Sequence, residues 1–251
     1  MPSDNKRLRI MAGPNGSGKS TILQEVRKKF YSGPFVNADE IEESFNEKGL
    51  VNLPAIYDLT VNDNSLTEFI KGPGKTWLQK AAKESSQINI ICLEGILLVK
   101  DKPSPYDAAL AADFIRYQLL IKRETFTFET VLSHPSKVDF LKQGIKVGYK
   151  NYLYFICTVD PAINIERIKQ RVSLGGHNVP EDRIEKRYYE SLNILPTIIP
   201  LCYRVYLFDN SSEERSIEPV AEIDDKRNLT IKTGQLPWWA QEHVINCLYK
   251  K

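Results

Sequence analysis

A glycine-rich stretch near the start of the chain constrains its fold most strongly. Residues 13–20 read Gly-Pro-Asn-Gly-Ser-Gly-Lys-Ser and fit the pattern G-x-x-x-x-G-K-[ST]. The apolar run at residues 8–12 precedes it as an expected strand, and residues 22–30 follow it as an expected helix. A strand, a glycine loop and a helix in this order are the setting in which the pattern forms a phosphate-binding loop, whereas a chance glycine-rich turn would lack both flanks. The sequence therefore predicts a nucleotide-binding α/β fold.

The residue types of this loop suit the phosphates of a nucleotide. Glycines let backbone N–H groups point at phosphate oxygens, and the N-terminus of the following helix adds a partial positive charge. We expect Lys19 to reach the β- and γ-phosphates and the Ser20 hydroxyl to bind Mg²⁺. The expected ATP-binding residues of the loop are Gly13, Pro14, Asn15, Gly16, Ser17, Gly18, Lys19, Ser20 and Thr21.

Strands and helices alternate along the rest of the chain. The expected strands are residues 35–37, 88–93, 126–132, 151–159 and 203–209, and the expected helices are residues 40–45, 106–121, 137–146, 162–172 and a segment from residue 181 onward. This alternation predicts a doubly wound parallel sheet. Residues 151–159 are almost continuously apolar, as is typical of a central strand that is buried on both faces. The fold class is a P-loop NTPase of nucleotide-kinase type, with a helical lid and an insertion after the second strand.

The length of 251 residues allows one sizeable domain with an insertion. We assign residues 1–212 to the kinase domain. Residues 49–122 are longer than a simple crossover needs, so part of them is expected to be an insertion on the acceptor side, where residues 97–99 extend the strand at 88–93 past Gly95. The helix at 106–121 is expected to be amphipathic. Residues 213–251 read as an edge hairpin and a closing helix on the same domain.

Charge and composition restrict the partners. Thirty-four Lys and Arg face 32 Asp and Glu, and a net charge of +2 gives no long-range attraction to nucleic acid or membrane. The start of the chain shows no apolar signal region, and no apolar run reaches the length of a membrane span. The four cysteines form no C-x-x-C pair and read as reduced thiols. We expect a cytoplasmic protein that binds neither nucleic acid nor membrane.

Two carboxylates stand where α/β sheets carry their chemistry. Asp39 follows the expected strand at residues 35–37, and Glu129 lies near the end of the strand at 126–132. Asp39 is the candidate base for an acceptor hydroxyl, and Glu129 is a candidate for acceptor binding or a water-mediated Mg²⁺ contact. Asp39 would equally suit the N-cap of the helix that follows, so the local sequence leaves both roles open.

Arginines recur on two helices joined by a glycine-rich turn. Arg167 and Arg171 share a face of the first helix, and Arg183 and Arg187 share a face of the second. Over a phosphate site, such a pair of helices would form a lid whose arginines neutralise the transferred group. The alternative is a solvated face with i,i+4 charge pairs.

Several motifs together resemble one family. Residues 13–21, Asn37-Ala-Asp-Glu-Ile41, Phe128-Glu-Thr130, the lid Arg171-Val-Ser-Leu-Gly-Gly-His-Asn-Val-Pro180 and Arg187-Tyr-Tyr-Glu-Ser-Leu192 are similar to the zeta-toxin family of P-loop kinases. The Gly-Gly-His-x-Val-Pro lid resembles a zeta-like subgroup, and residues 49–122 have no counterpart in the resemblance. Better-known zeta toxins use ATP and Mg²⁺ to phosphorylate the 3′-hydroxyl of the sugar in UDP-N-acetylglucosamine, which starves peptidoglycan synthesis.

The resemblance implies a role for each matching residue. Lys19 and Ser20 would bind phosphate and metal, and Asp39 would deprotonate the acceptor. Glu129 and Thr130 would bind the substrate. Arg171 and Arg187 would be the catalytic lid arginines. Arg183 is the alternative to Arg187 in this role and would bind ATP. The implied partners are ATP, a small-molecule hydroxyl acceptor such as a UDP-sugar, and an antitoxin protein.

Three functions remain open on the sequence. The first is an ATP-dependent phosphotransferase of zeta-toxin type with an alcohol group as acceptor. The second is a kinase of nucleosides or polynucleotide ends. The third is a nucleotide-gated binding module without catalysis, in which the lid reports the bound nucleotide.

Overall fold

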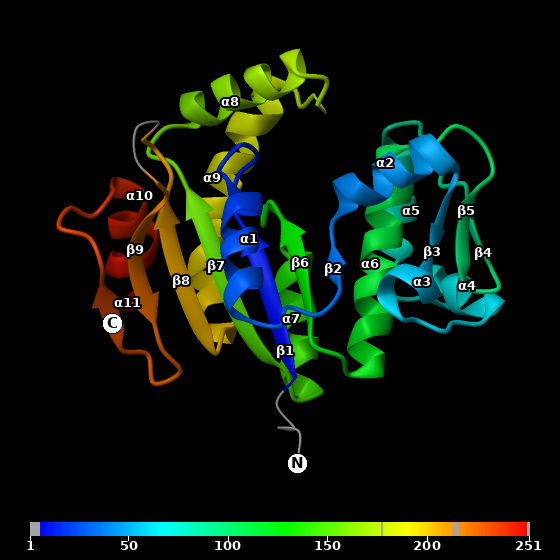
Figure 1. The fold of residues 1–251 in the computed structure, drawn as a ribbon, viewed down its shortest axis with the longest axis horizontal. Helices are drawn as coiled ribbons and strands as arrows, with labels where there is room; N and C mark the ends of the chain where they lie inside the picture. The colour runs from blue at the N-terminus through cyan, green and yellow to red at the C-terminus, as the bar shows by residue number, and fades with distance from the viewer. Residues whose placement is uncertain (1–5, 177, 213–215, 250–251) are drawn as a thin grey trace. The chain divides into compact units, whose positions relative to one another are not determined.

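The computed structural model describes residues 6–176, 178–212 and 216–249, and Figure 1 shows its fold. The chain forms two compact units. The first unit comprises Met1–Ser32 and Glu129–Lys251, and the second comprises Gly33–Phe128. Among the described residues, no helix has both the length and the apolar character needed to cross a membrane.

The first unit is built on a twisted sheet. Its strands are β1 (Arg7–Ala12), β7 (Lys150–Cys157), β8 (Arg204–Asp209), β9 (Glu218–Ile223) and β10 (Leu229–Ile231). They lie in the order β10-β9-β8-β7-β1. Strands β1, β7 and β8 are parallel, and β9 and β10 continue the sheet in antiparallel pairing. The predicted parallel core and the predicted edge hairpin are both confirmed.

Helices cover both faces of this sheet. Helix α1 (Lys19–Lys29) lies on one face, and α7 (Ser136–Lys146) and α9 (Glu181–Ile198) lie on the other (Figure 1). The closing helix is also confirmed, as a continuous run of α10 (Trp238–Ala240), a π-helical turn (Gln241–Ile245) and α11 (Asn246–Tyr249). Leu153, Phe155, Ile156 and Cys157 of β7 are fully buried, as expected of a strand covered on both sides.

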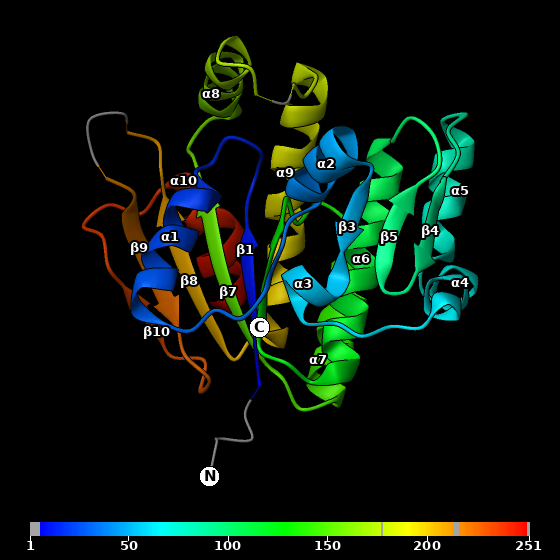
Figure 2. The same cartoon turned by 45° about the vertical axis from the view of Figure 1, so that its right-hand side comes forward.

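The predicted lid consists of α8 (Pro161–Ser173) and the first turns of α9. The Asp160 side chain caps α8 by accepting a hydrogen bond from the backbone N–H of Ala162 at 2.8 Å, and Pro161 stands in the first turn, where proline is favoured. Ile168, Val179 and Ile184 form a buried apolar cluster that ties the two helices together. Figures 1 and 2 show α8 beyond the carboxyl ends of β7 and β8. His177 of the lid motif lies outside the described residues.

The second unit contains the segment predicted as an insertion. Its short strand β2 (Phe35–Val36) pairs in parallel with β6 (Phe126–Thr130), whose last two residues belong to the first unit. A separate antiparallel sheet has the order β3-β5-β4 (Figure 2). The remaining elements of the unit are α2 (Ala38–Lys48), β3 (Leu50–Asn52), α3 (Leu53–Tyr57), α4 (Asp63–Lys71), α5 (Lys75–Lys83), β4 (Ile90–Leu93), β5 (Ile96–Val99) and α6 (Pro105–Lys122).

Two expectations for this segment are wrong. Residues 97–99 do not extend the strand before Gly95, because Glu94 and Gly95 adopt positive φ angles of 50° and 79° and reverse the chain into a hairpin. Two consecutive left-handed residues are what a tight two-residue hairpin requires. Helix α6 forms where predicted but is not amphipathic, since the consecutive residues Leu110, Ala111 and Ala112 are all fully buried.

Candidate functional site

The glycine loop between β1 and α1 folds back over a buried lysine. Lys19 is the first residue of α1, and its side chain is 6% exposed. Its Nζ donates hydrogen bonds to the carbonyls of Gly13 and Pro14, both at 3.0 Å. The same Nζ lies 3.6 Å from Oε1 of Glu129 at the end of β6. The structure thus brings together two residues that are 110 positions apart in sequence and that were both predicted for the site.

Side chains from neighbouring elements hold the outer side of the loop. Nδ2 of Asn164, on α8, donates to the carbonyl of Asn15 at 2.7 Å. Nδ2 of Asn210, just after β8, donates to the carbonyl of Ser17 at 2.9 Å, and the backbone N–H of Gly13 donates to the carbonyl of Thr130 at 3.3 Å. The two asparagines thus fix two carbonyls of the loop, and the end of β6 fixes the N–H of Gly13. Sequence reasoning missed both asparagines, although Asn210 stands directly after the last parallel strand.

Three buried polar atoms at the loop have no hydrogen-bond partner among the described residues. They are Oδ1 of Asn15, Oγ of Ser17 and Oε2 of Glu129. Such atoms are uncommon in folded proteins, because each costs about 1–3 kcal/mol when left unpaired. A hydroxyl and a carboxylate oxygen suit a phosphate and the water shell of Mg²⁺ respectively, since Mg²⁺ prefers oxygen ligands and keeps several waters. The residues present therefore fit a bound nucleotide and its metal.

The residues after Lys19 are open to solvent. Ser20 and Thr21 lie in the first turn of α1, and both are exposed. The Ser20 hydroxyl is therefore accessible to a metal ion. Metal binding by Ser20 remains a prediction.

The Thr130 side chain stabilises the turn that follows β6. Its hydroxyl accepts a hydrogen bond from the backbone N–H of Leu132 at 3.0 Å, and Leu132 has a φ angle of 61°. The side chain thus shapes the turn that leaves β6, in the manner of Ser and Thr turns. Its predicted contact with the substrate stays a prediction.

The lid arginines differ in their surroundings. Nη1 of Arg167 donates to the carbonyl of Asn210 at 2.7 Å, which ties α8 to the residue that supports the loop. Arg171 and Arg183 are exposed, and Arg187 is half-buried on α9. The exposed ion pair between Lys169 and Glu181, at 2.9 Å, links the two helices but contributes little stability in water. Arg167 is thus held by the backbone, whereas Arg171 and Arg183 are exposed to solvent.

Asp39 lies in the second unit, at the second position of α2. The N-cap alternative is wrong, because the Asn37 side chain accepts the hydrogen bond from the backbone N–H of Asp39 at 3.0 Å and thereby caps the helix. The Asp39 carboxylate is exposed in the first turn, where the helix dipole favours negative charge. The local geometry therefore leaves this carboxylate open to a substrate.

Known proteins share this fold at low sequence identity. A chain of the AvrRxo1-ORF1:AvrRxo1-ORF2 complex crystallised with sulphate ions matches with a TM-score of 0.58 and 13% identity, over 92% of this chain and 62% of that chain. The native form of that complex matches with a TM-score of 0.55 and 12% identity, over 97% and 70% of the two chains. The fold is that of an α/β P-loop NTPase. The present chain spans less than two thirds of the first of these relatives.

Sequence comparisons do not identify a family for the chain. No family model matches the chain. An uncharacterized protein of Haemophilus influenzae is 29% identical over 121 residues, which cover 47% of this chain and 86% of that protein.

Behind the P-loop lies a buried polar network. The hydroxyl of Tyr188 on α9 donates to the carbonyl of Thr158 at 2.6 Å, and the hydroxyl of Thr158 bonds Oδ1 of Asn164. Burial raises the pKa of Tyr188 far above its usual value, so the phenol stays a neutral donor. The network connects α9, the end of β7 and α8 to the P-loop carbonyl of Asn15.

We expect Asn164→Ala to weaken ATP binding about tenfold and to lower the free energy of unfolding by about 1–3 kcal/mol. The substitution removes the donor to the carbonyl of Asn15, and it removes one of the two acceptors of the buried Thr158 hydroxyl, which keeps only its hydrogen bond to the Asp160 carbonyl at 3.1 Å. Titration calorimetry with ATP and urea unfolding measure the two effects. Asn193→Ala, at an exposed position of α9, is the matched control. Unchanged ATP affinity in Asn164→Ala would show that α8 does not position the P-loop.

Proposed function

We propose that the protein is an ATP-dependent kinase that transfers the γ-phosphoryl group to a hydroxyl of a small molecule. The observation that carries the proposal is the P-loop itself. There the Nζ of buried Lys19 lies 3.6 Å from Oε1 of Glu129, and three buried polar atoms have no hydrogen-bond partner among the described residues. The fold supports it, because P-loop proteins use this arrangement to bind nucleoside triphosphates. A crystal structure of the AvrRxo1-ORF1:-ORF2 complex with ATP, matched at a TM-score of 0.50, supports ATP as the nucleotide.

On the donor side, the loop residues 13–21 bind the phosphates of ATP. Lys19 turns from its own loop carbonyls to the β- and γ-phosphates, and Ser17 donates its buried hydroxyl. Ser20 and Glu129 hold Mg²⁺ directly or through water, and the ion neutralises charge on the phosphates when bound. The loop and Lys19 would thereby orient the γ-phosphorus of ATP for attack, and a bound Mg²⁺ would supply neutralising charge there.

In the transfer step, Asp39 acts as the base. Its carboxylate accepts the proton of the acceptor hydroxyl, the hydroxyl oxygen forms a bond to the γ-phosphorus, and the bond to the leaving ADP oxygen breaks. Arg171 and Arg187 of the lid neutralise charge on the transferred phosphoryl group. Arg183 is the alternative to Arg187 in this role. The exposure of Asp39, Arg171 and Arg183 supports these roles, since each must approach a ligand.

The acceptor that fits the zeta-toxin resemblance is UDP-N-acetylglucosamine, phosphorylated at the 3′-hydroxyl of its sugar. The second unit, which carries Asp39, supplies the acceptor contacts. The zeta-toxin resemblance implies an antitoxin protein as a partner, and in the AvrRxo1-ORF1:AvrRxo1-ORF2 complex a chain of similar fold is likewise bound to a second protein. A reaction that consumes ATP and a sugar nucleotide belongs in the cytoplasm.

Mass spectrometry after incubation with Mg²⁺-ATP and a panel of UDP-sugars and nucleosides tests the proposal. The expected result is one added phosphate on UDP-N-acetylglucosamine, absent with Lys19→Ala, which excludes a contaminating kinase. If a nucleoside gains the phosphate instead, the protein is a nucleoside kinase and the UDP-sugar is not its acceptor. ATP binding without a phosphorylated product in any reaction would favour the nucleotide-gated binding module.

A further inference from the structure

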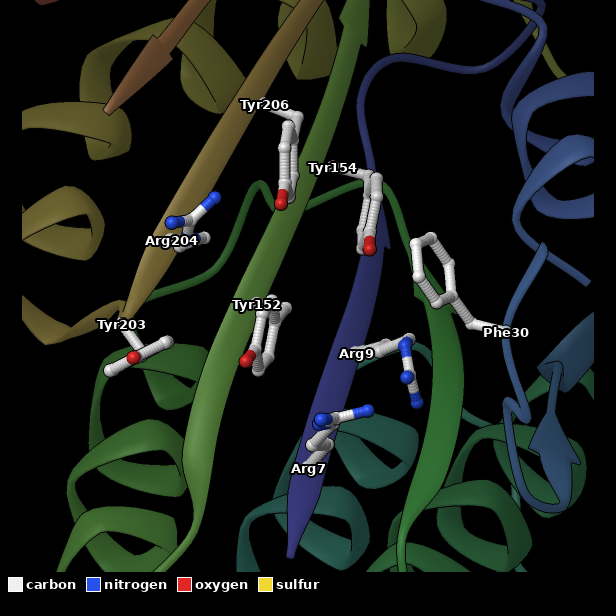
Figure 3. Close-up of a pocket in the computed structure, with 8 residues that line it drawn as sticks. All are labelled: Arg7, Arg9, Phe30, Tyr152, Tyr154, Tyr203, Arg204 and Tyr206. Atoms are coloured by element: carbon white, nitrogen blue, oxygen red, sulfur yellow. The ribbon is translucent and has the colours of Figure 1, made fainter. Parts of the chain in front are cut away.

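A second polar pocket lies on the sheet of the first unit, at the opposite end of α1 from the P-loop. Figure 3 shows its lining residues, and its volume is about 330 Å³. Arg7 and Arg204 are the first residues of β1 and β8, whereas the P-loop leaves the last residue of β1. Helix α1 is about 16 Å long by its 11 residues, and Phe30 follows it at the rim of the pocket. The pocket is therefore separate from the nucleotide site.

The lining follows from the two-residue period of the strands. Arg9 of β1 pairs with Tyr152 of β7, which pairs with Arg204 of β8, so the three side chains form one row on the same face. Tyr154 and Tyr206 form the next row, with stacked rings at 4.9 Å and 18°. A sheet face covered by a helix normally carries apolar residues at such positions. The arginines and tyrosines at these positions indicate that this face of the sheet binds a polar ligand.

Arg9 gives the strongest indication. It is 2% exposed, and its Nη1 has no hydrogen-bond partner within the part of the chain that the structure describes. Its guanidinium lies 6.0 Å from the ring centre of Tyr152, and Figure 3 shows it beside the cavity. A buried cation is costly unless an anion pairs with it. Nη1 of Arg9 is therefore suited to bind an anionic group of a ligand.

The other polar groups of the pocket are mainly donors. Burial raises the pKa of Tyr154 to about 12, so its hydroxyl stays protonated near neutral pH. Arg204 pairs with Glu222 at 2.7 Å, and its hydrogen bond with Tyr206 is the main cause of its raised pKa. Two further arginines, Arg7 and Arg9, also line the pocket.

We propose that this pocket binds a nucleoside monophosphate. Guanidinium groups match the oxygens of a phosphate in two-pronged hydrogen bonds, and tyrosine hydroxyls add donors. The volume is at the small end of the range for ligand pockets, which suits a mononucleotide. The exposed ring of Phe30 offers a flat surface on which a base stacks. The site is independent of the proposed kinase reaction.

Equilibrium dialysis with labelled UMP and AMP tests the site in the full chain, with the P-loop saturated by a non-hydrolysable ATP analogue. We expect saturable binding of one nucleotide per chain, displaced by inorganic phosphate only at higher concentration. Arg9→Gln and Arg204→Gln are each expected to weaken binding about tenfold or more. Lys142→Gln, which removes one positive charge from an exposed position of α7, is the matched control and should leave binding unchanged.

Three outcomes would overturn the proposal. One is the absence of saturable binding, and another is equal weakening by Lys142→Gln, which would reduce the effect to net charge. The third is binding of inorganic phosphate as tight as that of UMP and AMP, which would remove the role of the base. Because Arg9→Gln alters a buried residue, the half-exposed Arg204→Gln and Tyr206→Phe variants keep the test valid if Arg9→Gln does not fold.

Discussion

Asp39→Asn is expected to lower kcat for phosphoryl transfer by about 10³-fold while the affinity for ATP stays unchanged. The amide has the shape of the carboxylate but cannot accept the proton of the acceptor hydroxyl. The helix start is unaffected, because the cap is the Asn37 side chain and it bonds the backbone N–H of residue 39. We therefore expect a change in the free energy of unfolding of no more than about 0.5 kcal/mol. Steady-state kinetics, ATP titration and urea unfolding measure the three quantities.

Two matched variants separate proton transfer from other effects of charge. Glu43→Gln neutralises an exposed carboxylate on the same helix α2 and should retain full activity. Glu129→Gln alters the carboxylate that faces Lys19 and should change the dependence of the rate on Mg²⁺ concentration. If Glu129→Gln lost activity at all Mg²⁺ concentrations and Asp39→Asn kept it, the base would be Glu129.

The parts of the structure that depend on local sequence were predictable. The P-loop and its flanking elements follow from a contiguous pattern, and the Asp160-Pro161 start of α8 follows from the preferences of a cap and of proline. The continuous apolar run of β7 identified a central strand. In each case the signal and the structure that it specifies lie within a few residues of each other.

The supports of the P-loop were not predictable in the same way. The hydrogen bonds from Asn164 to Asn15 and from Asn210 to Ser17 join residues 149 and 193 positions apart. An asparagine has no periodic signal, and its role depends on which elements the fold brings together. The sequence left the Asp39 cap open as an alternative for a simpler reason, since Asn37 and Asp39 are both good caps and only the backbone angles decide between them.

The arginine and tyrosine face was present in the sequence as a period-two pattern in three strands. Its meaning depends on the pairing of Arg9 with Tyr152 and of Tyr152 with Arg204, which sequence periodicity alone does not give. The reversal at Glu94 and Gly95 was missed because the apolar residues on both sides of it suit one long strand as well as two short ones.

Gly13→Ala is expected to reduce the free energy of unfolding by about 3–5 kcal/mol, from backbone strain and overpacking together. Gly13 has a φ angle of 141°, and a Cβ at this position would lie 1.9 Å from the carbonyl oxygen of Ile156 in β7. The oxygen belongs to the backbone of β7, and the backbone of residue 13 fixes the position of Cβ, so neither a rotamer change nor a small shift relieves the contact. Urea unfolding measures this loss of stability.

The same substitution should lower activity about 10²-fold or more in the fraction that remains folded, since a shift of about 1 Å at a positioned group has that effect. The carbonyl of Gly13 accepts a hydrogen bond from Lys19 Nζ, so a displaced loop also displaces the lysine that reaches for ATP. Gly175→Ala is the matched control, because its φ angle is 88° and, among the described residues other than its chain neighbours, no atom lies within 4 Å of an added Cβ. It should cost only about 1 kcal/mol of backbone strain and leave activity intact. Equal losses in the two variants would mean that a positive φ angle, rather than the close approach of the loop to β7, makes glycine necessary at position 13.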